Sequence, residues 1–279
     1  MIKYIILSVL LLSCTEAQKQ GKGKEYTFKG KYAYQYNLDS RLDEISGFAL
    51  NSEGRLFTHN DELGIIYELN STNGKILKKF QVGTFGIEGD FEGLDIAGNK
   101  FYLLESDGKL YQFEEGKENE KVDFKLFETP FSNKYEFEGI CFAPDLKGLL
   151  LTVKEYSGKK YGSKLPVFLF SLETYLMVSE PLFFIDLKDL KKNYDIDDFY
   201  PSGIAISPIS GNYFIISSKG SPVIIESDTK GNILDVNMLD KSIHKQPEAV
   251  TILTDGSILI GDEKVKKAAT LTKYSIHKK

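Results

Sequence analysis

The segment Glu92-Gly93-Leu94-Asp95-Ile96 is one of five similar stretches in the chain, and their spacing decides the fold. Each stretch begins with Glu or Ser, continues with a small residue and is mostly apolar after that. The other four are Ser46–Leu50, Glu138–Phe142, Ser202–Ile206 and Glu248–Ile252. Three of the four steps between them are 46 residues, and the step from Glu138 to Ser202 is 64. A period of about 40 to 50 residues built from short strands is typical of β-propeller blades.

Each unit carries enough strand pattern for one four-stranded blade. Short runs of β-branched and aromatic residues are separated by turn pairs such as Asn73-Gly74 and Asp107-Gly108. The only helical pattern, residues 187–193, predicts at most a short turn. The longer third unit places an insertion between Tyr156 and Tyr200, which is either a solvated decoration or a specificity loop.

The last unit is one strand short, and the N-terminal segment 26–38 has the alternating pattern that would complete it. We therefore predict an all-β, five-bladed β-propeller whose last blade is closed by the N-terminal strand, which removes an open sheet edge. A six-bladed ring is the alternative, but the insertion is too short for four more strands. The propeller is expected to form a single domain, residues 26–279.

The residues before this domain predict export and a lipid anchor. A short apolar run ends in Leu11-Leu12-Ser13-Cys14, which resembles a bacterial lipobox. We expect residues 1–13 to be a lipoprotein signal peptide, Cys14 to be lipidated and residues 14–25 to form a flexible tether. The protein would then lie in the cell envelope and contact the membrane only through its lipid. Thr15, in place of the aspartate that marks inner-membrane retention in some Gram-negative bacteria, favours the outer membrane.

Composition narrows the class of partner. The 279-residue chain has a net charge of −5, so nucleic-acid binding is not expected. Beyond Cys14, the only cysteine is Cys141, so no intrachain disulfide is available. No two of the 3 histidines have metal-ligand spacing, which argues against zinc. We expect a monomer whose partner is a protein or a glycan.

The first strand of each blade lines the central channel of a propeller, so equivalent residues form a ring around it. The ring position here is occupied by Ser46, Glu92, Glu138, Ser202 and Glu248. Carboxylates crowded together repel one another unless something compensates their charge. Ca²⁺, which prefers oxygen ligands, is the simplest compensation. In the alternative, the carboxylates only bond to backbone amides of neighbouring blades.

A second acidic layer is expected near the end of the second strand of four units. Its members are Asp61, Glu105, Glu155 and Asp262. Together with Ser46 and Ser202, these are secondary candidates near the channel, as further oxygen ligands, substrate contacts or turn caps. Nucleophilic catalysis has little support, since neither a Gly-x-Ser-x-Gly elbow nor a Gly-rich phosphate loop occurs in the sequence.

The five motifs together resemble the SdiA-regulated family of bacterial envelope proteins, over about residues 34–276. They are Glu44–Gly47, Asp90–Gly93, Phe137–Gly139, Pro201–Gly203 and Gln246–Ala249. The resemblance implies a five-bladed propeller, distantly similar to NHL-repeat proteins, with a bound calcium ion. It places Glu92, Glu138 and Glu248 at the family's glutamate positions, which makes them the metal candidates. Ala249 departs from the usual glycine, and no established enzymatic activity comes with the resemblance.

Two classes of function remain. The first is a non-catalytic envelope module that binds a protein or glycan and holds calcium as a structural or bridging ion. The second is a calcium-dependent hydrolase, phytase-like or lactonase-like, in which the ion would activate water and Asp61 or Glu105 would act as base. The acidic channel motifs and the 16 tyrosines favour the binding module.

Overall fold

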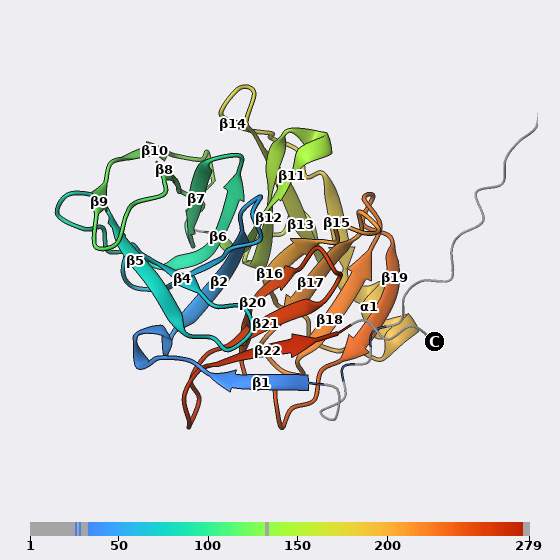
Figure 1. Ribbon diagram of the computed structural model, residues 1–279. Coiled ribbons are helices and arrows are strands. Elements are labelled where there is room, and N and C mark those ends of the chain that lie inside the picture. Colours follow the sequence, from blue (N-terminus) through green and yellow to red (C-terminus); the bar gives the residue numbers. More distant parts are fainter. Residues whose placement is uncertain (1–25, 27, 29–32, 132–133, 276–279) are drawn as a thin grey trace, which may run out of the picture.

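The computed structural model describes residues 26, 28, 33–131 and 134–275. The strands of these residues form five sheets arranged around one axis (Figure 1). The predicted signal peptide, tether and lipidated Cys14 lie outside the described residues. Within those residues, no helix has both the length and the apolar character needed to cross a membrane.

The five repeated segments form the innermost strands, as the sequence predicts. These strands are β2 (Ile45–Leu50), β6 (Phe91–Ala97), β11 (Tyr135–Ala143), β16 (Pro201–Ile206) and β20 (Pro247–Ile252). Each packs against the inner strands of the two neighbouring blades, and β20 packs against β2. The ring is therefore closed with five blades, and the six-bladed alternative is wrong.

The remaining strands follow outward in order within each blade. In blades 1 and 2 they are β3 (Leu56–Asn60), β4 (Ile65–Leu69), β5 (Ile76–Val82), β7 (Lys100–Glu105), β8 (Leu110–Glu114) and β10 (Phe124–Phe127). In blades 3 and 4 they are β12 (Gly148–Tyr156), β13 (Lys164–Ser171), β17 (Tyr213–Ser217), β18 (Val223–Ser227) and β19 (Ile233–Met238). Blade 5 adds β21 (Ile258–Asp262) and β22 (Thr270–Tyr274), and two 3-10 turns are η2 (Ser40–Leu42) and η3 (Pro144–Leu146).

The predicted closure by the N-terminal strand is confirmed. Strand β1 (Ala33–Asn37) pairs antiparallel with β22, with Ala33 opposite Tyr274. Tyr274 in turn lies opposite Ile258, at the end of the channel where the inner strands finish. The first strand of the chain, β1, therefore begins at the same end of the channel at which the last strand, β22, finishes.

The hydrophobic core lies between adjacent blades. Phe57 of blade 1 meets Phe101 of blade 2 edge to face, with ring centroids 5.0 Å apart. Both rings are almost fully buried, and burial of each stabilises the fold by about 1.5–3 kcal/mol. Aromatic packing of this kind between the faces of adjacent sheets stabilises the contact of one blade with the next.

The insertion in the third unit is part of the fold and carries a helix. Strands β14 (Leu176–Met177) and β15 (Phe183–Asp186) share the outer edge of β13. Helix α1 (Leu187–Tyr194) follows, capped by Asp186, which accepts a hydrogen bond from the Lys188 N–H. Leu190 of α1 is fully buried in the core between blades 3 and 4. The sequence predicts at most a short turn here, and this burial explains why the helix is longer.

A loop of blade 2 reaches across to blade 1. Strand β9 (Lys121–Val122) pairs in parallel with β5, so blade 1 gains a fifth strand on its outer edge. Nothing in the sequence pattern predicts this strand. It covers an edge that would otherwise offer free backbone groups to another chain.

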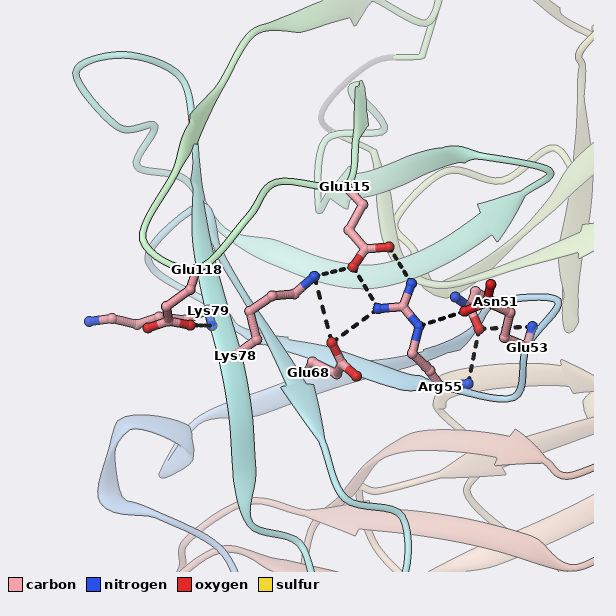
Figure 2. Close-up of polar contacts among 8 residues, drawn as sticks. All are labelled: Asn51, Glu53, Arg55, Glu68, Lys78, Lys79, Glu115 and Glu118. Atoms are coloured by element: carbon pink, nitrogen blue, oxygen red, sulfur yellow. Dashed lines mark hydrogen bonds and ion pairs between the residues drawn. The ribbon is translucent and has the colours of Figure 1, made fainter.

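Ion pairs join the same two blades nearby (Figure 2). The Arg55 guanidinium donates to both oxygens of Glu115, at 2.6 and 2.5 Å, and to Glu68 at 3.1 Å. Lys78 also binds Glu115 and lies 3.6 Å from Glu68. The hydrogen bond from Arg55 is the main cause that holds the pKa of Glu115 below its usual range, with Lys78 adding to it.

We predict that Arg55→Gln lowers the free energy of unfolding by about 1 kcal/mol at pH 7, as expected for a half-buried ion-pair network. Because the folded pKa of Glu115 is depressed, its contribution is present above the unfolded value and lost as the pH falls through the folded pKa. The difference between variant and wild type should thus shrink at pH 3 in urea denaturation. Arg41→Gln, which removes an exposed pair with Asp39 and a contact with the Tyr67 ring within blade 1 but leaves the network intact, is the control. An equal loss in both variants would contradict a specific role for the network.

Candidate functional site: the channel ring

A β-bulge marks the start of the inner strand in every blade. In blade 2, Phe91 lies opposite Glu105 and Gly93 lies opposite Leu104, so Glu92 has no partner across the strand pair. The registers of the other four blades skip the equivalent residue in the same way. Bulges re-aim side chains and occur often beside functional sites. We call the five bulged residues the channel ring: Ser46, Glu92, Glu138, Ser202 and Glu248.

The small residue after each ring position lets the inner strands converge. A Cβ on Gly93 would lie 2.8 Å from Ile140 Cγ2, and one on Gly47 would lie 2.9 Å from the Leu94 backbone nitrogen. Either side chain would push neighbouring blades apart. The free volume enclosed at the ring is about 10 Å³, which is room for about one water molecule or one ion.

The three ring carboxylates are held in different ways. Glu138 is buried and accepts a hydrogen bond from the Lys154 ammonium. Glu92 accepts from the Ser46 hydroxyl at 3.1 Å, which joins blades 1 and 2. Glu248 is 6% exposed, and its Oε2 atom is buried without a hydrogen-bond partner. The remaining ring hydroxyl, that of Ser202, donates to the Pro247 carbonyl at 2.7 Å.

Crowding in a buried place raises the pKa of all three glutamates. Burial raises the pKa of Glu92 to about 9, with a further contribution from the charge of Glu138. Burial is also the main cause for Glu138 and Glu248, whose pKa values rise to about 8. Lys154 lowers the pKa of each glutamate, but burial and mutual repulsion outweigh it, so ionising all three together costs free energy.

Lys154, on β12, is the basic residue at the ring, and we did not predict it from the sequence. Burial lowers its pKa, but the charge of Glu138 and its hydrogen bond outweigh burial, so the pKa is raised. Its ammonium also lies 3.6 Å from Glu136. A second lysine, Lys219, pairs with Glu155 at 2.7 Å and makes no ion pair with a ring glutamate.

The strand registers define a second layer behind the ring. In each blade, the residue just before the bulge pairs with a residue of the second strand. The residue that follows this partner in the sequence belongs to the second layer. The layer consists of Asp61, Ser106, Lys154, Ser218 and Glu263. Of the four acidic residues predicted for a second layer, the structure places only Asp61 here. The Asp61 Oδ1 atom is buried without a partner, and burial raises the pKa of this group to about 6.

The other predicted members of that layer have local partners. Glu105 accepts from the Tyr111 hydroxyl at 2.8 Å, and Glu155 pairs with Lys219 at 2.7 Å. Asp262 accepts from the buried His244 ring at 2.7 Å. These contacts give each of the three residues a partner outside the ring.

Glu263 is an acidic member of the second layer that the sequence pattern does not predict. It follows Asp262 directly, and its pKa is raised to about 7 by burial, then by the charges of Asp61 and Glu92. The bulge shifts by one residue the position of the second strand that lies next to the ring, from Asp262 to Glu263. Knowing the bulge would have predicted Glu263, but the sequence spacing alone does not show it.

The ring suits a calcium ion in the chemistry of its atoms. Its side chains offer carboxylate and hydroxyl oxygens, which Ca²⁺ prefers, and Glu248 Oε2 has a lone pair with no other use. As the side chains stand, no three His, Cys, Asp or Glu residues within the described part of the chain are grouped for direct ligation. Direct ligation of an ion would therefore require the ring side chains to turn toward one another.

Fold and ring together define the class: a five-bladed β-propeller whose channel ends in buried carboxylates. The model of the SdiA-regulated family matches residues 29–245. The chain belongs to the SdiA-regulated family, which confirms the resemblance seen in the five motifs. No curated protein matches the sequence.

Solved propellers resemble the fold. Glutaminyl cyclase of Myxococcus xanthus has a TM-score of 0.55 and 14% identity, over 86% of this chain and 95% of that one. The PQQ-bound aldose sugar dehydrogenase of Streptomyces coelicolor has a TM-score of 0.54 and 13% identity, over 90% and 99%. A streptogramin B lyase has a TM-score of 0.51 and 13% identity, over 88% and 98%. At these identities the likeness shows the fold alone.

We predict that, in chelator, the free energy of unfolding falls by about 2 kcal/mol or more between pH 6.5 and pH 9. The folded pKa values of Glu92, Glu138 and Glu248 lie above their unfolded value, so their stabilising protonation is lost as the pH rises through about 8 to 9. Buried His59, whose pKa is lowered to about 4, affects stability only below this window.

The measurement is urea denaturation of wild type and of a variant carrying Glu92→Gln, Glu138→Gln and Glu248→Gln. The variant should lose most of the slope because glutamine does not titrate. A wild-type stability that stays constant or rises toward pH 9 would show that the ring carboxylates ionise without cost.

Proposed function

We propose that this protein is a calcium-binding β-propeller module of the bacterial envelope, lipid-anchored through Cys14 in the outer membrane. The observation that carries the calcium site is the buried, unpartnered Oε2 of Glu248 beside two more carboxylates. The module would act as a monomer and bind a protein or glycan, with the ion holding the channel mouth in shape.

Charge balance supports a divalent ion. The three ring glutamates, when ionised, face the single positive charge of Lys154, which lowers the pKa of each of them. One divalent cation would leave this group neutral. It would also remove the cost of ionising carboxylates in a buried place.

The size of the site favours a binding module over the hydrolase alternative. A hydrolase needs an open coordination position beside room for its substrate, whereas about 10 Å³ at the ring admits one small ion. Of the two bases considered for hydrolysis, Glu105 is already hydrogen-bonded to Tyr111. The ion is thus better placed to support structure than to polarise an ester.

The test is calorimetric titration of Ca²⁺ into chelator-treated protein at pH 8. We expect one saturable site, with affinity at least ten-fold weaker in the Glu92→Gln, Glu138→Gln double variant, because each carboxylate supplies charge and oxygen ligands. Glu105→Gln, a carboxylate near the same end of the channel but outside the ring, should bind as wild type does.

Equal binding by the double variant would place the ion elsewhere. No binding by wild type would leave the ring a purely structural contact between blades. Mg²⁺ is the comparison ion, and it should bind more weakly because it requires regular octahedral geometry.

A further inference from the structure

The end of the channel opposite the ring opens into a cavity. It is formed where the inner strands finish, and its volume is about 160 Å³. We call it the funnel. The side chains of its walls are mostly apolar and include Leu50, Ile96, Phe142, Ile206 and Ile252, while its accessible surface is polar and apolar in similar shares. Apolar side chains combined with a few placed polar groups are usual in a small-molecule site.

One carboxylate, that of Asp95 on β6, lines the funnel among these apolar side chains. The equivalent residues of the other inner strands are all small and uncharged: Ala49, Cys141, Ala205 and Thr251. The acidic side chain therefore breaks the five-fold pattern at one place. It lies three residues beyond Glu92 and faces the other end of the channel.

The Asp95 carboxylate accepts hydrogen bonds only from backbone amides, and its oxygens can still accept hydrogen bonds from a ligand. Its Oδ1 accepts from the Ile96 N–H at 2.8 Å, and its Oδ2 accepts from the Phe142 N–H of the next blade. Each carboxylate oxygen can accept a second hydrogen bond. Burial raises the pKa of Asp95 to about 7, and only these two backbone bonds lower it, so no cationic side chain of the described residues compensates its charge.

We propose that the funnel binds a small amphiphilic primary amine, with its hydrocarbon part against the apolar walls and its ammonium group on Asp95. The cavity volume is close to that of cavities that hold one benzene-sized group. An ammonium group supplies the missing positive charge and up to three donors. This site is separate from the channel ring and does not depend on calcium.

The test uses 2-phenylethylamine as probe and 2-phenylethanol as its neutral analogue, titrated into the full protein at pH 8 in EDTA. We expect the amine to bind at least ten-fold more tightly than the alcohol, as hydrogen bonds to a charged group predict. Asp95→Asn should weaken amine binding to the level of the alcohol.

Two further variants make the result independent of the Asp95 substitution. Ile206→Phe fills the funnel while keeping Asp95, and should abolish binding of both probes. Glu92→Gln with Glu138→Gln changes only the ring and should bind the amine as wild type does. Circular dichroism confirms that each variant is folded, and if Asp95→Asn is not, the probe comparison and Ile206→Phe decide.

Either of two outcomes would overturn the proposal. The first is that wild type binds neither probe at millimolar concentration. The second is that amine and alcohol bind equally, which would mean that Asp95 serves only to join β6 to β11.

Discussion

The structure depends on the close approach of five inner strands at one small residue in each. At Gly93 a single added methyl group would meet Ile140 of the next blade at 2.8 Å, and at Gly47 it would meet Leu94 of the next blade at 2.9 Å. This approach brings residues 46 or 64 positions apart in the chain onto one narrow ring. It also crowds three carboxylates where water cannot easily reach them. The unusual proton affinity of Glu92, Glu138 and Glu248 is a direct result of how tightly the blades pack.

Such crowding is tolerated because the blades are held together elsewhere. Aromatic contacts such as that of Phe57 with Phe101 fill the space between sheets, and β9 with the Arg55 network ties blade 1 to blade 2 (Figure 2). A scaffold that rigid can keep polar groups in costly positions, a pattern often found at functional sites. The repeated bulge is the local device, because it points one residue per blade into the channel and leaves the strand pairing intact on both sides.

The architecture could be read from the sequence because it rests on repetition. The spacing of the five segments and the incomplete last unit predict the blade number and the closure by β1, and both are confirmed. Other features depend on contacts between distant residues. Lys154 and Glu263 reach the ring only because bulges shift the register, β9 exists only beside β5, and α1 forms because Leu190 finds a core to enter.

The path of the chain through blade 5 gives the molecule a direction. Strand β1 begins beside the point where β22 ends, as Figure 1 shows. The registers place both points at the funnel end of the channel. The carboxylate ring lies at the opposite end. The two ends of the described chain and the ring carboxylates are therefore separated by the length of the channel, so a fusion or label added next to β1 or β22 would lie away from the ring.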